Sequence, residues 1–433
     1  MIKIVKSGQP NFQKIIDKIV NRGETISGNV LEDVNKIIED VRKNGDRALL
    51  EFTEKFDGIK ISPEDIAISK SEIDAKLKEL AEDDLVVIET ASKRIEDYHR
   101  HQAQTGLSFT DDFGNVLEQV VRPLSRVGVY VPGGRFPYPS TLLMNAIPAN
   151  VAGVGNIVAT HPTPGGSISP SIAAAVKLSG VDNIFRIGGA QAIAALSFGT
   201  ETIPKVDKVV GPGNVYVAAA KKLLFGIVDI DMIAGPSEIL IISDGKLNPA
   251  YAAYDLLSQA EHDPLSASIL ITTDDKFAAS VKDELQSILK NDPAMKIANE
   301  SLTNFGALIV VDNIDEAISI ANDIAPEHLE LLLENPRNYL DKVKNAGAVF
   351  LGTNSTEPIG DYIAGTNHVL PTGGTARFSS PLGVYDFVKR MSVIEMSEKG
   401  LDELGPVAAK FARMEGLSAH AQAIEVRLKD NKK

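Results

Sequence analysis

The residues of this sequence best suited to chemistry are histidines in its C-terminal half. Four of the seven histidines lie there, each with a polar or acidic residue within five positions. Imidazole and carboxylate groups bind divalent metals and also transfer protons near neutral pH. The pattern therefore indicates a metal site or an acid-base site. The four residues are His262, His328, His368 and His420.

Gln259 and His262 are three positions apart in a predicted helix that ends before Pro264. Side chains with this spacing share one helix face, so both could reach one ion. The structural alternative is a polar helix C-terminus at which an imidazole interacts favourably with the helix dipole. The spacing alone favours that alternative.

The sequence Ala325-Pro326-Glu327-His328 predicts the start of a helix, with proline at the first position and glutamate near the positive helix end. In the functional interpretation, Glu327 and His328 supply two proton acceptors of different basicity to one site. The residues themselves leave both interpretations open.

Three further polar residues lie near predicted turns or a predicted helix start. Asp361 and His368 flank the turn residues 365–367, and His420 follows Ser418, a candidate N-cap of the last helix. A helix N-terminus disfavours the imidazolium form and would keep His420 neutral, as a metal ligand must be. Taken singly, such residues are more often structural than catalytic.

Cysteine is absent from the chain. This excludes a disulfide framework, a thiolate zinc site and a cysteine nucleophile. It agrees with a cytoplasmic protein without requiring one.

The charge and hydropathy patterns argue against nucleic acid and membrane as partners. Acidic residues outnumber basic ones by 58 to 44, the net charge is −14, and no basic stripe is interleaved with aromatic residues. The N-terminus lacks an apolar segment of the kind found in signal peptides. The most apolar long window, 142–160, is interrupted by three asparagines and a proline, so we expect no membrane span.

The spacing of apolar residues predicts an α/β fold. The chain, with 433 residues, exceeds the roughly 250–300 residues that one core usually serves, so at least two domains are expected. Helical periodicity covers the first hundred residues, including a polar-faced stretch at 71–104, and then short β-branched runs alternate with helical segments. After Pro381 the strands stop and 383–433 is expected to be mostly helical. The predicted strands are 127–131, 156–160, 183–187, 206–210, 239–243, 268–273, 307–311 and 348–351.

Glycine and proline follow some of these strands, as in Pro132-Gly133-Gly134, Gly211-Pro212-Gly213 and Gly235-Pro236-Ser237. Ligands of open α/β sheets bind at the carboxyl ends of strands, so these loops are candidate binding sites. The dinucleotide fingerprint G-x-G-x-x-G is missing, because Tyr216 interrupts its nearest match. The strand, glycine turn and helix expected around 211–222 are only a weak phosphate-binding signal.

Several motifs together resemble the histidinol dehydrogenase family, in the order of that family from about residue 30 to the C-terminus. They are Val127-Gly-Val-Tyr-Val-Pro-Gly-Gly134, Gly188-Gly-Ala-Gln-Ala-Ile-Ala-Ala195, Gly211-Pro-Gly-Asn214, Ala234-Gly-Pro-Ser-Glu238, Asp255-Leu-Leu-Ser-Gln-Ala-Glu-His262, Pro326-Glu-His328, Gly360-Asp361 with Asn367-His368, and Glu415-Gly-Leu-Ser-Ala-His420.

The resemblance implies two similar, incomplete Rossmann-like (doubly wound) α/β domains with small helical additions. The N-terminal helical segment is expected at 1–25. The larger domain is expected to be discontinuous, with 26–129 plus 237–382, and the second domain, which contacts NAD, at 130–236. A C-terminal helical segment, 383–433, is expected to reach the partner subunit of a homodimer.

The resemblance also implies the cofactors, zinc and NAD, and the residues that hold them. One zinc ion per subunit would be bound by Gln259, His262, Asp361 and His420, with Asp361 and His420 coming from the other subunit. Further substrate contacts would be Ser237, His328, His368 and Glu415. NAD would contact Tyr130, Gln191 and Asn214.

The implied activity is the oxidation of L-histidinol through L-histidinaldehyde to L-histidine, with reduction of two NAD, in the last steps of histidine biosynthesis. The family assigns proton acceptance from the alcohol to His328 and water activation for the aldehyde to Glu327. Three alternatives remain: a zinc hydrolase, a relative that oxidises another alcohol, and a non-catalytic α/β binding module.

Overall fold

The computed structural model describes residues 2–10, 12–23, 27–133, 137–292 and 295–430. Parts of the predicted N-terminal segment 1–25, Gly134 of one glycine loop and the last three residues of the tail therefore lie outside the described residues. The chain forms two compact units. The first contains Met1–Gln102 and Ser125–Phe387, and the second contains Ala103–Leu124 and Val388–Lys433.

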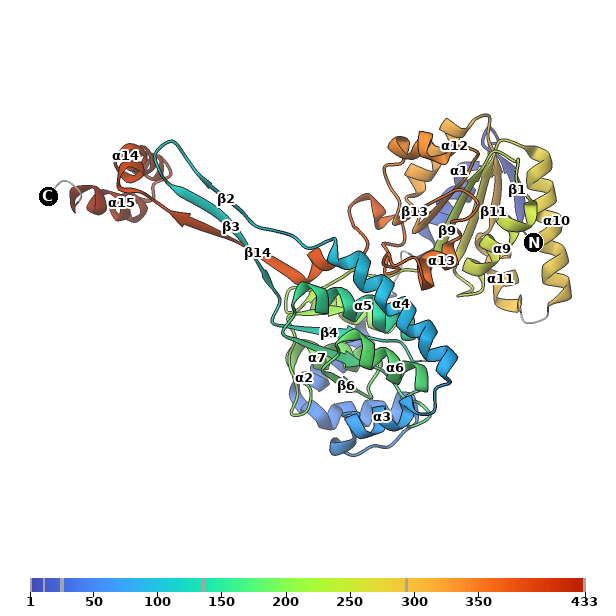
Figure 1. The fold of residues 1–433 in the computed structure, drawn as a ribbon, viewed down its shortest axis with the longest axis horizontal. Coiled ribbons are helices and arrows are strands. Elements are labelled where there is room, and N and C mark those ends of the chain that lie inside the picture. The colour runs from blue at the N-terminus through green and yellow to red at the C-terminus, as the bar shows by residue number, and fades with distance from the viewer. Residues whose placement is uncertain (1, 11, 24–26, 134–136, 293–294, 431–433) are drawn as a thin grey trace. The chain divides into compact units, whose positions relative to one another are not determined.

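The first unit contains a six-stranded sheet in which all neighbouring strands are parallel (Figure 1). One of its two central strands, Glu238–Ser243, is buried along its whole length, as expected for a strand covered on both faces. The strand order is β1 (Lys3–Lys6), β11 (Ala307–Val310), β10 (Ala267–Thr272), β9 (Glu238–Ser243), β12 (His328–Leu332) and β13 (Ala348–Leu351).

Helices cover both faces of this sheet, and each face has its own apolar core. One core joins alternate strand residues to α1 and α12, and the other joins the remaining strand residues to α9, α10 and α11. Full burial of an aliphatic side chain contributes about 1.5–3 kcal/mol, so these two layers fix the sheet. The helices are α1 (Phe12–Val20), α9 (Pro249–Ala260), α10 (Asp275–Asn291), α11 (Lys296–Phe305) and α12 (Ile314–Ile324), with the short α13 (Glu357–Tyr362) following β13.

The first unit also contains a five-stranded parallel sheet. Numbered along the chain, its strands have the spatial order 3-2-1-4-5, which is the order of the dinucleotide-binding fold, with the switch point between the first and fourth strands. In this sheet those two are β4 and β7. The strands are β6 (Asn183–Phe185), β5 (Asn156–Thr160), β4 (Arg126–Tyr130), β7 (Lys208–Val210) and β8 (Asp229–Ile230).

The helices of this part of the chain form two groups. Helices α2, α7 and α8 share one core with the sheet, and α4 packs on α5 and α6. Gly128 permits the close approach of α7, since a Cβ at this position would lie about 3.0 Å from a methyl group of Leu196. The helices are α2 (Gly28–Asp57), α3 (Lys70–Leu77), α4 (Glu82–Arg100), α5 (Pro139–Ala152), α6 (Pro170–Ser179), α7 (Gly189–Phe198) and α8 (Val215–Leu224).

The second unit consists of a three-stranded antiparallel sheet and two helices that pack on each other. The expectation that strands stop after Pro381 is wrong, because β14 pairs with β3 over eight residues. Long antiparallel strands with little burial give a weak hydropathy signal, which explains the omission. The elements are β2 (Leu107–Thr110), β3 (Val116–Pro123), β14 (Val388–Glu395), α14 (Glu398–Met414) and α15 (Ser418–Asp430).

The predicted α/β fold is confirmed, and each of the eight predicted strands is present within a few residues. The helix start predicted at Pro326 is wrong. Helix α12 ends at Ile324, its C-cap Ala325 has a left-handed backbone (φ 53°), and the buried strand β12 begins at His328. Pro326 therefore follows a helix end, another common position for proline. The stretch predicted at 71–104 forms two helices, α3 and α4, and α15 begins at Ser418 itself, within the usual uncertainty of a helix boundary.

Sheet membership divides the chain differently from the expected domain boundaries. The N-terminal segment adds β1 to the edge of the six-stranded sheet, where it pairs with β11. Helix α2, expected in the larger domain with 237–382, packs instead on α7 and α8. The reason is its apolar face, because Val34, Ile37 and Val41 are buried in the core of the five-stranded sheet. Among the described residues, no helix is long and apolar enough to cross a membrane.

Candidate active site

A cavity of about 310 Å³ in the first unit contains most of the predicted site residues. It is built from the carboxyl ends of strands in the five-stranded sheet and from the amino ends of strands in the six-stranded sheet, because Gly211 follows β7 whereas Ser237 precedes β9 and Glu327 precedes β12. The expectation that ligands lie at carboxyl ends thus describes only the first of the two sheets. The predicted residues that line the cavity are Asn214, Ser237, Gln259, His262, Glu327, His328, Asp361 and His368.

Glu238, the first residue of β9, holds Glu327 and His328 in place. Its backbone N–H donates to Glu327 Oε2 at 2.9 Å, and its side chain accepts from the Glu327 backbone N–H at 3.3 Å. Its carbonyl oxygen lies 2.9 Å from His328 Nδ1. Since a carbonyl only accepts hydrogen bonds, His328 Nδ1 carries the proton of that bond, and Nε2 is the ring nitrogen left for chemistry.

Glu238 is itself held by Arg22, a residue of the 3₁₀ helix η1 (Asn21–Gly23). A guanidinium nitrogen of Arg22 lies 3.0 Å from Glu238 Oε1, and the two side chains are only 2% and 6% exposed. Arg22 also donates to the backbone carbonyls of Pro236 and Ser237 at 3.1 and 3.2 Å. Because these bonds satisfy both buried charges, the N-terminal segment fixes the start of β9 and the residues that β9 positions.

Carboxylates surround the His328 ring. Asp361 Oδ1 lies 3.6 Å and Glu357 Oε1 3.9 Å from Nε2, and Glu327 Oε2 lies 3.7 Å from Nδ1. Among the described residues, His328, Glu357 and Asp361 form a group whose ligand atoms lie within 4.8 Å of one another and could hold a metal ion. This group shares only Asp361 with the predicted zinc ligands.

The crowding shifts the pKa values of these groups. Burial acts to lower the pKa of His328, but Glu327, Asp361 and Glu357 outweigh it and raise that pKa to about 10. Burial raises the pKa of Glu327 to about 7. Burial also acts to raise the pKa of Asp361, yet His328 and His368 lower it to about 2. Strong shifts in opposite directions within one cavity are typical of sites that transfer protons or bind cations.

Three of the four predicted zinc ligands line this cavity. Gln259, near the end of α9, is 1% exposed, and its Oε1 has no hydrogen-bond partner among the described residues. Such an orphaned acceptor fits a cation ligand. His262 follows the same helix, and Asp361 lies in α13. The expectation that Asp361 comes from the other subunit is therefore wrong, because α13 of this chain already places it beside Gln259 and His262. Amide oxygen, imidazole and carboxylate are all donors that zinc accepts, so this set fits the metal.

Two of the other predicted residues lie outside this cavity, and a third, His368, lines it and contacts Asp361. His420 in α15 and Glu415 at the C-cap of α14 belong to the second unit, where both side chains are exposed. His368 Nδ1 donates to the backbone carbonyl of Asp361 at 3.0 Å, so its Nε2 remains available. Sequence reasoning missed Arg22, Glu238 and Glu357. Only Glu238 had a signal, as the last residue of the motif that begins at Ala234.

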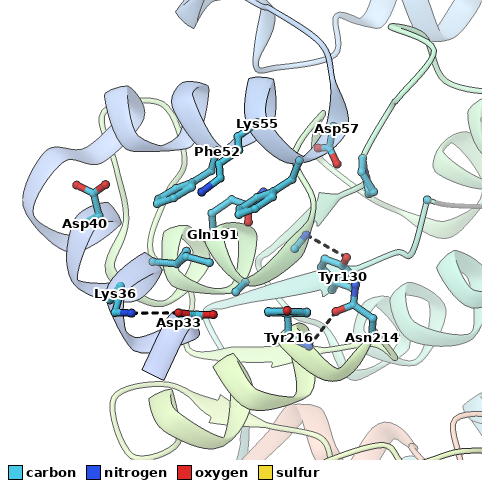
Figure 2. Close-up of a pocket in the computed structure, with 16 residues that line it drawn as sticks. Asp33, Lys36, Asp40, Phe52, Lys55, Asp57, Tyr130, Gln191, Asn214 and Tyr216 are labelled. Atoms are coloured by element: carbon cyan, nitrogen blue, oxygen red, sulfur yellow. Dashed lines mark hydrogen bonds and ion pairs between the residues drawn. The ribbon is translucent and has the colours of Figure 1, made fainter. Parts of the chain in front are cut away.

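A second cavity, of about 640 Å³, lies at the carboxyl ends of β4 and β7 and is lined by all three residues predicted to contact NAD (Figure 2). The Tyr130 hydroxyl accepts from the Gly189 backbone N–H at 3.2 Å. Gln191 is 1% exposed, and neither atom of its amide has a partner among the described residues. Asn214 Oδ1 caps α8 by accepting from the backbone N–H groups of Tyr216 and Val217.

The expected turn at 211–222 is confirmed, because β7 ends at Val210 and α8 begins at Val215. Gly211 (φ +113°) lies so close to Tyr130 that a Cβ would meet its carbonyl oxygen at 2.1 Å, so only glycine fits. Asn214 at the end of this turn lines both cavities. The large cavity therefore adjoins the one that contains Glu327 and His328.

A dinucleotide-binding strand order, a large polar cavity at its switch point and an adjoining cluster of imidazole and carboxylate groups define the class of α/β dehydrogenases. The family model described as histidinol dehydrogenase matches residues 20–428. The chain belongs to the histidinol dehydrogenase family, whose members are NAD-dependent oxidoreductases of the final steps of histidine biosynthesis.

Individual relatives agree over the full length. The chain is 49% identical to histidinol dehydrogenase of Syntrophotalea carbinolica over 431 residues, covering 100% of both chains, and 50% identical to that of Clostridium acetobutylicum over 430 residues, covering 99% of both. The crystal structure of histidinol dehydrogenase from Elizabethkingia anophelis superposes with a TM-score of 0.93 at 38% identity, covering 100% of this chain and 99% of that one. The resemblance stated from the motifs is thereby confirmed.

Proposed function

We propose that this protein oxidises L-histidinol through L-histidinaldehyde to L-histidine, with reduction of two NAD, using one zinc ion per subunit. The observation that carries the proposal is the convergence of Gln259, His262 and Asp361 on the cavity that contains Glu327 and His328. Chelating groups and two proton acceptors thus meet in one place, beside a cavity suited to a dinucleotide. We place the enzyme in the cytoplasm, in keeping with its lack of cysteine.

Zinc would be held by Gln259, His262 and Asp361 of one cavity, with His420 as the fourth ligand. When bound, the ion would supply a positive charge that holds nitrogen donors of the substrate and offsets the surrounding carboxylates. Ser237 and His368 line the same cavity and would contact the substrate. Glu415 would contact it from the segment that carries His420.

His328 acts as the base in the alcohol step. The surrounding carboxylates alone would keep this ring protonated, whereas the charge of a bound zinc ion would offset them and leave Nε2 free to accept the proton of the substrate hydroxyl. NAD, when bound, would take the hydride from the same carbon, and the C–O bond would become a carbonyl. The bond from Nδ1 to the Glu238 carbonyl holds the ring with Nε2 available. The ring is 3% exposed, so bulk water is largely excluded.

Glu327 acts as the base in the aldehyde step. The aldehyde carbon must gain an oxygen before it can lose a second hydride, and the route through a cysteine thioester is closed because the chain has no cysteine. Water would add to the carbonyl carbon and give a proton to Glu327, which leaves the anion of the aldehyde hydrate. This anion would become the carboxylic acid by losing hydride, which a second NAD would accept. The Glu238 backbone N–H aims the Glu327 carboxylate for this role.

A homodimer would bring His420 and Glu415 to the cavity of the partner subunit. The second unit supports this proposal because its strands and helices expose large apolar side chains, which a second copy would cover. They include Leu107, Phe109, Ile394, Val407, Phe411 and Met414.

The test is the number of NADH formed per histidinol consumed, with and without a chelator. The proposal predicts two per substrate, and none after metal removal. One NADH per substrate would leave the aldehyde step to another enzyme. Metal-dependent hydrolysis of an amide or ester without NADH would favour the zinc hydrolase, and faster turnover of a different alcohol would favour a relative of altered specificity.

A further inference from the structure

The large cavity contains one carboxylate that folding does not explain. Asp57 is the last residue of α2, where the helix dipole is negative and disfavours an acid. One of its oxygens, Oδ2, is buried and has no hydrogen-bond partner among the described residues. Burial also raises the pKa of this carboxyl. A buried acceptor in an unfavourable place, on the wall of a binding cavity, calls for a donor from outside the protein.

The residue that usually recognises the cofactor ribose is missing from its usual place. In dinucleotide-binding folds, an acid at the end of the second strand accepts hydrogen bonds from the adenosine ribose. Here the second strand is β5, and His161 and Pro162 follow it. His161 is buried, its Nδ1 donating to the Val131 carbonyl at 3.3 Å, and Pro162 lines the cavity. The His161 ring has one acceptor nitrogen at most, Nε2, and the proline side chain has none, so neither offers the two anionic acceptor oxygens of a carboxylate.

We propose that Asp57 takes over this role: it accepts the 2′- or 3′-hydroxyl hydrogen of the adenosine ribose and excludes the 2′-phosphate of NADP. The inference rests on the proposed function, in which this cavity binds NAD. The acid then comes from α2, a helix outside the usual strand-turn-helix unit. Figure 2 places Asp57 on the same side of the cavity as Tyr130 and away from Asp33.

The other charges of the cavity make a weaker contribution to this choice. Lys36 is exposed and paired with Asp33 at 3.1 Å, and the ammonium of Lys55 lies 5.2 Å from the centre of the Phe56 ring. With Asp40, the lining has three carboxylates against two ammonium groups. Exposed charges are screened by solvent and salt, whereas a half-buried carboxylate is screened much less.

The experiment compares two probes that differ only in the 2′-phosphate: adenosine 5′-monophosphate and adenosine 2′,5′-bisphosphate. Their binding to the full-length enzyme is measured by calorimetry for the wild type, Asp57→Asn, Asp57→Ser and the control Asp33→Asn. Wild type is expected to prefer the monophosphate. Loss of a charged hydrogen bond typically changes affinity about 10- to 100-fold, so both Asp57 variants should shift the preference toward the bisphosphate by that factor.

The control separates local recognition from the general charge of the cavity. Asp33→Asn removes the same charge from an exposed position and should shift the preference less than about threefold. A shift as large as that of Asp57→Asn would overturn the inference, as would unchanged preference in both Asp57 variants. A lower melting temperature with unchanged preference would assign Asp57 a purely structural role, which also overturns it. Histidinol-dependent NADH formation by the wild type tests the proposed function separately.

Discussion

The two cavities of the first unit adjoin each other but use opposite chemistry. In the larger one, the groups predicted to contact the cofactor are neutral, from Tyr130, Gln191 and Asn214, and its charged groups other than Asp40 and Asp57 are exposed. The smaller one concentrates Glu327, His328 and Asp361, all largely buried and all with shifted pKa values. Burying a charge without a partner costs much more free energy than burying a neutral polar group. The comparison supports a cofactor-binding role for the larger cavity and a catalytic role for the smaller one.

The two regions also differ in how they are held. In the binding region, a helix cap and a glycine turn are sufficient to place Asn214. In the reacting region, Glu238 and Arg22 form a buried framework around Glu327 and His328. Substitutions that distinguish the two regions therefore test the comparison.

The largest effect is expected for Glu327→Gln. A positioned general base contributes about 10²–10⁴-fold, so oxidation of histidinaldehyde should slow by that factor while zinc stays bound. Single-turnover rates with histidinaldehyde and metal analysis of the purified variant are the measurements. Glu334→Gln, which removes an exposed carboxylate just beyond β12, is the matched control and should leave the rate unchanged. Unchanged turnover in Glu327→Gln would remove Glu327 from the mechanism.

Arg22→Met tests the buried Arg22–Glu238 pair that holds the reacting region in place. The change leaves Glu238 buried without its cation, and breaking a buried pair in this way typically costs about 3–5 kcal/mol of unfolding free energy. Denaturant titration measures that loss. Lys6→Met breaks an exposed pair with Asp275 and should cost less than about 1 kcal/mol. Equal effects of the two substitutions would contradict a special role for the Arg22 pair.

Asp255→Asn tests how much a buried acid, Asp255 of α9, lowers the stability of the fold at high pH. Burial raises the pKa of Asp255 to about 6. An acid whose pKa is higher in the folded than in the unfolded state stabilises the fold only while protonated, so wild-type stability falls as the pH rises from about 4 to 6. The neutral amide escapes this loss, and the variant should gain about 2–3 kcal/mol relative to wild type at pH 8 compared with pH 4. An identical difference at both pH values would contradict the prediction.

The smallest effect is expected in the binding region. Asn214→Ala removes the cap of α8 and should cost about 1 kcal/mol of stability together with some affinity for NAD. Asn214→Ser retains capping ability and should recover the stability but not the affinity. Melting temperatures and NADH titration measure the two quantities. If Asn214→Ser recovers both the stability and the NAD affinity, capping of α8 is the whole role of Asn214.

Features that depend on neighbouring residues in the sequence can be predicted from it, whereas contacts between residues far apart in the sequence cannot. Parallel strands such as β9 are continuous apolar runs and are visible locally, and the turn before α8 is marked by its glycines. The sequence wrongly predicts a helix start just before strand β12, because Pro326 is equally suited to the position after a helix end. The role of Arg22 could not be predicted, since its partner Glu238 is more than two hundred residues away and only folding brings them together.

The strongest disagreement between sequence and geometry concerns the metal. The family motifs assign zinc to Gln259, His262, Asp361 and His420, whereas proximity in the described part of the chain selects His328, Glu357 and Asp361. In the second arrangement His328 would be a ligand, with no free nitrogen to act as a base.

A crystal structure of the zinc-loaded enzyme with histidinol, with anomalous data at the zinc edge, decides between them. We predict one ion on Gln259, His262 and Asp361 of one subunit and on His420 of the partner subunit, with His328 Nε2 facing the substrate hydroxyl. An ion bound by His328 and Glu357, with Gln259 and His262 unengaged, would contradict the account.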